Sequence, residues 1–195
     1  SSLEDENSNN TQTMDNFLQR NLVRFIAFLE KTAPSKSELA LKFIKQAHTY
    51  LQKPDAGHAV DTLVRPYLLK KPKIVITHSL GTVIAFKLLR ELESQMDELE
   101  IPLFITLGSP LSLAAVKNCL GLPRKRPKSV KKWVNFFDPS DIVTLGRGLT
   151  EDSFAVNIEN HGDVDNKTFN CHGASGYLRH DGFISELTDA INHLK

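Results

Sequence analysis

A serine stands where a run of β-branched apolar residues gives way to a helical pattern, in the stretch IVITHSLGTVIA that begins at Ile74. A nucleophilic serine must be exposed at the edge of a sheet and held rigidly, and a sharp strand-to-helix turn does both. Small residues two before and two after the serine let strand and helix pass closely. Gly81 holds the second of these positions, and the larger Thr77 stands where the usual pattern has a glycine. The pattern predicts a nucleophile at Ser79, and the alternative is a serine that caps the following helix.

A serine nucleophile needs a histidine base and an acid that orients it, and in this topology the order along the chain is serine, acid, histidine. Asp138 and Asp141 follow the apolar stretch WVNFF, and either could serve the histidine or hold a turn. The base is expected in a loop before the last helix. His172 lies there among small residues, and His161 and His180 are its rivals.

The elements that must position these residues alternate between strand and helix after Pro72, which predicts an α/β fold with a mostly parallel sheet and helices on both faces. The expected strands are 74–77, 103–107, 133–137 and 154–158, and the expected helices are 81–96, 111–120 and 182–194.

Before Pro72 the apolar residues recur at three- and four-residue steps, which predicts helices instead of strands. These helices are expected over 14–29, from an N-cap at Ser35 or Ser37 to about residue 47, and over 58–69. Residues 1–13 are polar and read as a flexible arm. Residues 14–195 are expected to form one domain, with a helical segment at 14–70 and the half that carries the serine turn at 73–195.

The composition is that of an ordinary globular protein, with 195 residues, 41% hydrophobic, 24% charged and a net charge of +1. This charge gives no argument for binding nucleic acid or an anionic membrane. Two cysteines are too few for a disulfide framework, so a cytoplasmic location is expected. The histidines lack metal-ligand spacing and no nucleotide-binding glycine pattern occurs, so neither metal nor cofactor is expected. The basic stretch 124–132 predicts a solvated loop, with lipid head groups or a partner chain as the alternative ligand.

Four segments, THSLGT, TLGSPL, NFFDPSDIV and HGASGYL, resemble the α/β-hydrolase serine hydrolases, and in particular their lipase-like branch. The resemblance covers about residues 73–194. It implies Ser79 as nucleophile, Asp141 of the DIV segment as acid and His172 as base, with Asp138 as the alternative acid. It also implies that the backbone N–H of Leu80 donates to the oxyanion.

That family places further strands before the nucleophile strand, where this chain has helical patterns. We therefore expect an incomplete or N-terminally truncated hydrolase fold, whose sheet a missing N-terminal segment or a partner chain would complete. The expected activity is a serine esterase or lipase acting on an acyl ester of a small molecule or a lipid. The alternatives are a degenerate hydrolase fold used for binding or scaffolding, and one part of a split hydrolase.

Overall fold

The computed structural model describes residues 34–194 except residue 97 and residues 167–169. The predicted arm 1–13 and the predicted helix 14–29 lie outside the described residues. The helices are α2 (Pro34–Gln52), α3 (Pro54–Leu69), α4 (Leu80–Leu92), α5 (Ala114–Leu120), α6 (Ala174–Leu178) and α7 (Asp181–His193), with a 3₁₀ turn η1 (Pro110–Ser112). In this part of the chain, no helix combines the length and the apolar character that crossing a membrane requires.

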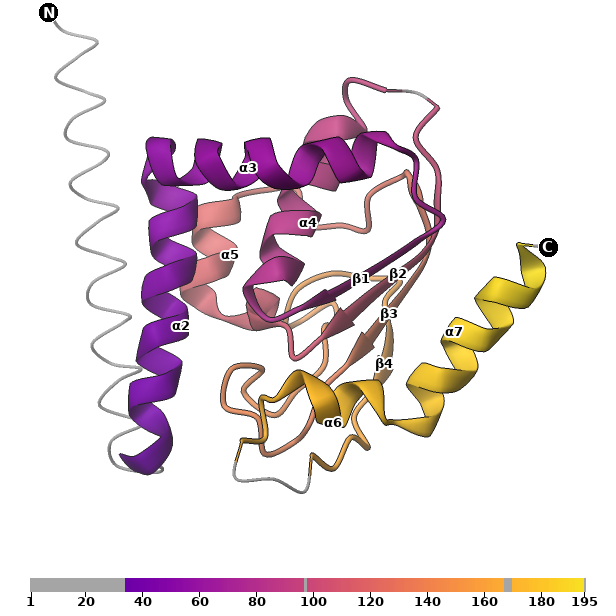
Figure 1. Cartoon of the computed structure of the whole chain (residues 1–195). Coiled ribbons are helices and arrows are strands. Elements are labelled where there is room, and N and C mark those ends of the chain that lie inside the picture. Colours follow the sequence, from indigo (N-terminus) through magenta and orange to yellow (C-terminus); the bar gives the residue numbers. More distant parts are fainter. Residues whose placement is uncertain (1–33, 97, 167–169, 195) are drawn as a thin grey trace, which may run out of the picture.

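The sheet consists of four parallel strands in chain order, β1 (Ile74–His78), β2 (Ile101–Leu107), β3 (Val130–Phe136) and β4 (Glu159–His161). Helix α4 connects β1 to β2, and α5 lies between β2 and β3 along the chain (Figure 1). The predicted α/β class with a parallel sheet is therefore confirmed. Because all four strands run in one direction, their carboxyl ends meet at the same edge of the sheet.

Helices cover both faces of the sheet (Figure 1). One core cluster consists of residues from the four helices α2, α3, α4 and α5 packed against Phe104 and Trp133 of the sheet. A second cluster joins Tyr177 of α6 and Phe183 of α7 to strand residues such as Ile105, on the other face. Alternate residues of each buried strand thus contact different helix layers, as expected for a sheet that is covered on both sides.

A ladder of buried polar side chains crosses the sheet at one register. Thr106 Oγ1 donates to Asn135 Oδ1 at 2.9 Å, and Asn135 Nδ2 donates to Asn160 Oδ1 at 3.0 Å. Asn160 also bonds the backbone N–H and carbonyl of Leu149, at 2.8 and 3.0 Å. Satisfied buried polar groups resist displacement, because breaking them leaves unpaired groups out of water. The ladder, buried at Thr106 and Asn135 and partly buried at Asn160, therefore anchors the middle of the segment between β3 and β4.

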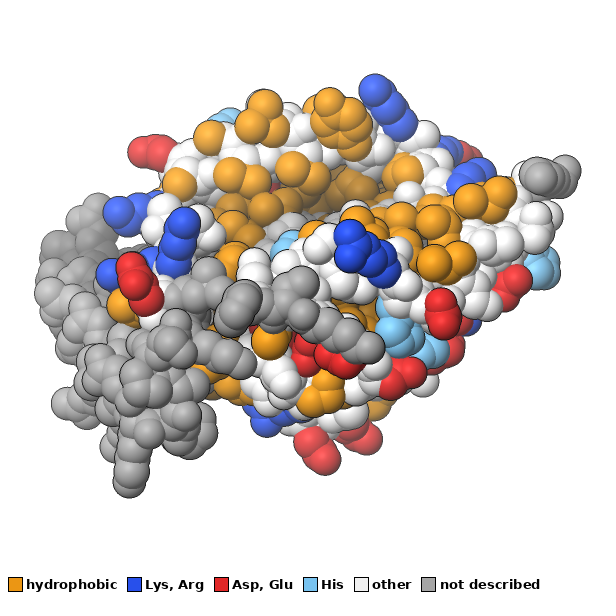
Figure 2. All heavy atoms as spheres, turned by 60° about the horizontal axis from the view of Figure 1, so that its bottom comes forward, with side chains coloured by type: hydrophobic (Ala, Val, Ile, Leu, Met, Phe, Trp, Pro, Cys, Tyr) orange, Lys and Arg blue, Asp and Glu red, His pale blue; other side chains and the backbone are white. Residues whose placement is uncertain are grey.

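β1 pairs with β2 and, among the residues that the structure describes, with no other strand. Its central residue Ile76 is 41% exposed. Figure 2 shows hydrophobic side chains gathered around a hollow on the side of the molecule that is turned toward the viewer. That a further segment or another chain pairs with this strand stays a prediction.

Two helices begin earlier than the periodicity predicted. α2 begins at Pro34, so Ser35 and Ser37 lie inside its first turn and the predicted N-cap at either serine is wrong. α3 begins at Pro54 instead of residue 58. Proline is tolerated at the first position of a helix, because its missing N–H would have no partner there. Both helices thus extend back to a proline that the pattern treated as a boundary.

The predicted strand over 154–158 is wrong, and the fourth strand is β4. Phe154 packs against Phe86 and Trp133 with ring centroids 5.1 and 6.1 Å apart, in the core cluster under the sheet. Asn157 has a φ of +61°, which interrupts extended backbone. Helix α6, over the small residues after His172, was not predicted.

Candidate active site

Ser79 occupies a strained turn between β1 and α4. Its φ and ψ are +54° and −127°, in a region that residues with a side chain rarely adopt. The turn is held from both sides, because Ser79 N donates to Leu107 O at 3.0 Å, and Ser79 O accepts from Thr82 Oγ1 at 2.7 Å. The turn has room for Thr77 in place of the usual glycine. A Cβ added at Gly81, across the turn, would lie 3.9 Å from the Thr77 Cβ, which is an ordinary van der Waals distance. The backbone therefore fixes the direction of the serine side chain.

The Ser79 side chain makes no capping hydrogen bond to α4, although the residue stands at the N-cap position. Its Oγ lies instead 2.8 Å from His172 Nε2, contributed by the loop before α6. Both side chains are almost fully buried, so Ser79 is less exposed than the turn pattern predicted for a nucleophile. The geometry thus favours an interaction between serine and histidine over the capping role left open by the sequence.

His172 bridges the serine and a carboxylate. Its Nδ1 lies 2.8 Å from Asp141 Oδ2, while its Nε2 faces Ser79 Oγ. A carboxylate can only accept, so Nδ1 carries the hydrogen, and in the neutral ring Nε2 is then free to accept from the hydroxyl. The structure therefore brings Ser79, His172 and Asp141 together in one chain of hydrogen bonds, from segments far apart in the sequence.

Asp141 is held in place by three donors. Its Oδ1 accepts from Val143 N at 2.9 Å, and its Oδ2 accepts from Tyr177 OH at 2.6 Å as well as from His172. Burial and the charge of Asp141 raise the pKa of Tyr177 above its usual range. Tyr177 therefore stays protonated at physiological pH and donates its hydroxyl hydrogen. This tyrosine follows His172 by five residues, near the end of the segment HGASGYL, and no role at the acid was predicted for it.

Replacing Tyr177 with phenylalanine is expected to lower kcat by about 10-fold to 100-fold with little change in KM, because a hydrogen bond to a charged group contributes about 1.5–3 kcal/mol. Ester hydrolysis at several substrate concentrations separates the two constants. Because the pKa of Tyr177 is raised, we expect its deprotonation to cause no loss up to pH 10 in the pH profile of the expected ester hydrolysis. Tyr67→Phe on α3 is the matched control, because this tyrosine is 67% exposed. Equal losses in both variants, or a change in KM alone, would contradict the role.

Asp138, the alternative acid, bonds to backbone groups instead of a histidine. Its Oδ1 accepts from Ser140 N at 2.7 Å and its Oδ2 from Asn166 N at 2.9 Å. Its own N–H donates to Tyr177 OH at 3.2 Å. Asp138 therefore stabilises the turn at Ser140 and the loop at Asn166. Asp141, three residues later, is the aspartate that contacts His172.

Two aromatic side chains pack around the His172 ring. His78 donates from Nε2 to the carbonyl of His172 at 2.8 Å. Burial and the neighbouring His172 lower the pKa of His78 below its usual range, which keeps it neutral. Phe43 of α2 meets the His172 ring edge-on, with centroids 4.5 Å apart. Phe43 carried no signal in the sequence beyond its place on an apolar helix face.

Gly108, directly after β2, lies against the same group. Its φ is +55°, and an added Cβ would stand 3.1 Å from Asp141 Oδ2 and 3.2 Å from the His172 ring. Any larger residue would therefore press on the contact between acid and histidine. A glycine that directly follows a buried strand was the only sequence signal for this role.

Leu80 is the first residue of α4. A backbone N–H in the first turn of a helix has no partner within the helix and lies at the positive end of the helix dipole. The sequence assigned this N–H to the oxyanion, and its place beside Ser79 suits a developing negative charge. This assignment stays a prediction.

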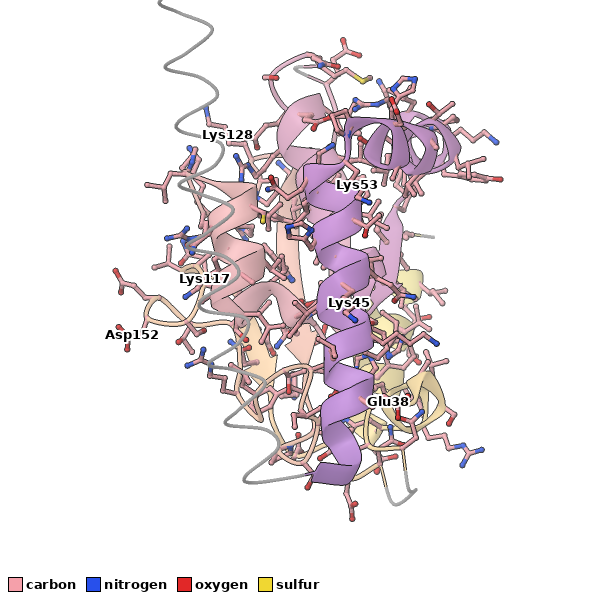
Figure 3. The ribbon with its side chains drawn as sticks, turned by 90° about the vertical axis from the view of Figure 1, so that its left-hand side faces the viewer. Glu38, Lys45, Lys53, Lys117, Lys128 and Asp152 are labelled. Carbon is pink, nitrogen blue, oxygen red and sulfur yellow. The ribbon has the colours of Figure 1, made fainter. Side chains whose placement is uncertain are left out.

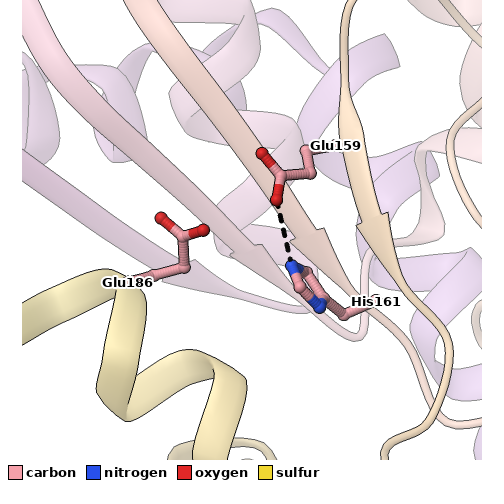
Figure 4. A group of neighbouring side chains, drawn as sticks. All are labelled: Glu159, His161 and Glu186. Carbon is pink, nitrogen blue, oxygen red and sulfur yellow. Dashed lines mark ion pairs between the residues drawn. The ribbon is translucent and has the colours of Figure 1, made fainter. Parts of the chain in front are cut away.

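His161 and His180 lie against Phe136 of β3 instead of joining Ser79, with ring centroids 4.6 and 5.6 Å from the phenylalanine ring. His161 belongs to a group with Glu159 and Glu186, whose donor atoms all lie within 4.8 Å of one another (Figure 4). Such donors can hold a divalent cation. Here the Lys132 ammonium lies 2.7 Å from Glu186 and 3.2 Å from Glu159, so it already balances both carboxylates.

The basic stretch 124–132 forms local contacts. Lys131 pairs with Glu100 at 3.1 Å, and Arg124 donates to the carbonyl of Lys117 at 3.4 Å. Figure 3 shows Lys117 and Lys128 on the same side of the molecule as α2. The predicted loop extends only to residue 129, because Val130 begins β3 and Lys131 and Lys132 lie in that strand. The alternative of an anionic ligand stays a prediction.

Comparison of the chain with protein-family models, with characterised proteins and with solved structures finds no match.

Proposed function

We propose that this protein is a serine hydrolase of the α/β-hydrolase type that cleaves an acyl ester. The observation that carries the proposal is the continuous path from Ser79 Oγ through His172 to Asp141 Oδ2, with both hydrogen bonds at 2.8 Å. The strained turn at Ser79, between a buried strand and a helix, supports the same assignment. A serine that only caps a helix would require neither the hydrogen bond to His172 nor a strained backbone conformation.

In the first half of the reaction, Ser79 Oγ attacks the carbonyl carbon of the ester and its proton passes to His172 Nε2. The carbonyl oxygen becomes an oxyanion, which the Leu80 N–H would stabilise. His172 then returns the proton to the leaving alcohol as the carbon–oxygen bond breaks, which leaves an acyl group on Ser79. Water repeats the sequence in the second half, releases the acid and restores the serine.

Asp141 acts through His172. A charged carboxylate beside Nδ1 selects the tautomer that can accept from serine and stabilises the imidazolium that forms during attack. Tyr177 and Val143 N hold this carboxylate, so its position does not depend on the histidine alone. The whole sequence of steps needs only side chains of this chain and water.

Labelling with a fluorophosphonate tests the proposal, because this reagent forms a stable bond with a serine that has a base within hydrogen-bond reach. We expect one equivalent of label on the peptide that contains Ser79, found by mass spectrometry. Ser79→Ala should abolish labelling, whereas Ser94→Ala, at an exposed serine after α4, should leave it unchanged. Labelling at another serine, or none in the folded protein, would sink the proposal and favour the alternative of a binding module.

Among the described residues β1 pairs on one side only, with β2, and this bears on the form in which the enzyme works. Edge strands with apolar residues and unpaired backbone groups tend to associate with another strand. The exposed Ile76 supports the proposal that a further segment or chain covers this edge. The labelling experiment is therefore carried out on the full chain, with any copurifying partner retained.

A further inference from the structure

A groove of about 630 Å³ lies between α2, α3 and the start of α4. Its size falls within the range of about 300–1,000 Å³ that is typical of small-molecule sites. The hydrophobic residues that line it are Leu41 and Tyr50 of α2, Ala56 and Val60 of α3, and Leu80 of α4. The other five lining residues are charged or polar: Glu38, Lys42, Lys45, Gln46 and Thr49. The hydrophobic half of the groove suits an uncharged, apolar group.

Buried polar contacts fix one wall of the groove. Tyr50 OH donates to Asp61 Oδ1 at 2.6 Å, and Lys87 Nζ lies 2.6 Å from Asp61 Oδ2. Burial raises the pKa of Tyr50 above its usual range, so it remains a donor. The tyrosine hydroxyl is thus engaged behind the wall. This wall of the groove is therefore fixed by contacts within the protein.

The mouth of the groove is bordered by exposed side chains of α2. Lys42 and Lys45 lie there, with Glu38 one turn before Lys42. Figure 3 shows Glu38 and Lys45 on the outward side of α2. The long stems of lysines lie readily along an apolar ligand while their charges stay in water. The border therefore does not close the groove to an extended chain.

The groove reaches the residue next to the candidate nucleophile. Leu80, which lines it, is the residue after Ser79, and its backbone N–H is the expected oxyanion donor. His172 lies on the other side of Ser79 and must reach the leaving oxygen to return its proton. The carbonyl oxygen is thus directed to the Leu80 N–H and the leaving oxygen to His172. The acyl substituent is the remaining group, and the apolar groove that Leu80 lines is available to it.

We propose that this groove binds the acyl chain of the ester, so that the preferred substrates carry an aliphatic chain of medium length or longer. The assignment rests on the proposed function, because it takes the attack by Ser79 as the starting point. Each buried methylene group contributes about fourfold to an equilibrium constant, so a chain that enters the groove gains strongly over acetate.

Hydrolysis of p-nitrophenyl acetate, butyrate and octanoate tests the assignment. We expect kcat/KM to rise from acetate to octanoate by at least about 10-fold. Val60→Trp should fill the groove and lower the value for octanoate by about 10-fold, with acetate changed less than about twofold. Leu63→Trp is the matched control, because Leu63 lies one turn further along α3, is 71% exposed and does not line the groove. This variant should keep the chain-length preference.

A binding measurement separates the groove from the chemistry. The Ser79→Ala protein should bind 11-(dansylamino)undecanoate with an increase in fluorescence, and the added Val60→Trp change should abolish this binding while Leu63→Trp leaves it intact. If Ser79 takes the label but chain length has no effect and Val60→Trp changes nothing, the groove assignment is overturned and the hydrolase stands. If the dansyl probe binds with this selectivity but no serine is labelled, the groove stands as a ligand site and the hydrolase falls.

Discussion

Replacing His172 with alanine is expected to lower kcat/KM for an acyl ester by about 10⁶-fold, the loss seen when the base of a serine triad is removed. The physical reason is that Ser79 Oγ is 2.8 Å from His172 Nε2, and without this base the hydroxyl has no acceptor positioned for its proton. Hydrolysis of a p-nitrophenyl ester, followed spectrophotometrically at high enzyme concentration, measures the remaining rate.

The rival histidines supply the controls for this experiment. His161→Ala and His180→Ala remove rings that pack on Phe136, and they should change kcat/KM by less than about 10-fold, because neither ring lies on the path from Ser79 to Asp141. Circular dichroism would show whether each variant is folded. Retention of full activity in a folded His172→Ala protein would contradict the assigned base, and a large loss in either control would point to that histidine.

Asp141→Asn should have the second largest effect, a decrease of about 10⁴-fold in kcat. Asparagine keeps the size of the side chain but can present an N–H to His172 Nδ1. The ring then favours the tautomer with its hydrogen on Nε2, which cannot accept from Ser79. The measurement is kcat at saturating ester, with the free energy of unfolding determined by urea denaturation in parallel.

Asp138→Asn is the matched control for the acid. Asp138 accepts from Ser140 N and Asn166 N, so its replacement should destabilise the fold and leave most of the activity of the folded fraction. The values of kcat are corrected for the folded fraction of each variant. If the loss is then greater in Asp138→Asn than in Asp141→Asn, Asp138 and not Asp141 is the acid.

Local sequence patterns determined most of the elements that carry the candidate site. The apolar run before Ser79 predicted β1, and the three- and four-residue spacing after it predicted α4, because burial of one strand or one helix face imposes its own period on the chain. The same patterns identified β2, β3 and α7. They failed at residues 154–158, where Phe154 is apolar because it fills the core cluster with Trp133 and not because it lies in a strand.

The residue types of the site were also visible in the sequence. A serine at a strand-to-helix turn selected Ser79, and a small-residue loop selected His172. Between the two aspartates the residues alone left a choice, because both follow β3 and both suit turns. The resemblance favoured Asp141, and only the tertiary structure places its Oδ2 2.8 Å from His172 and gives the oxygens of Asp138 to backbone groups.

Contacts between distant segments could be learned only from the fold. Tyr177 reaches Asp141 across 36 residues of sequence, and Phe43 of α2 reaches the His172 ring from the other end of the described chain. The groove beside Leu80 is likewise formed by three helices. Periodicity reports which face of an element is buried but not which element buries it, because that choice is made by packing over the whole molecule.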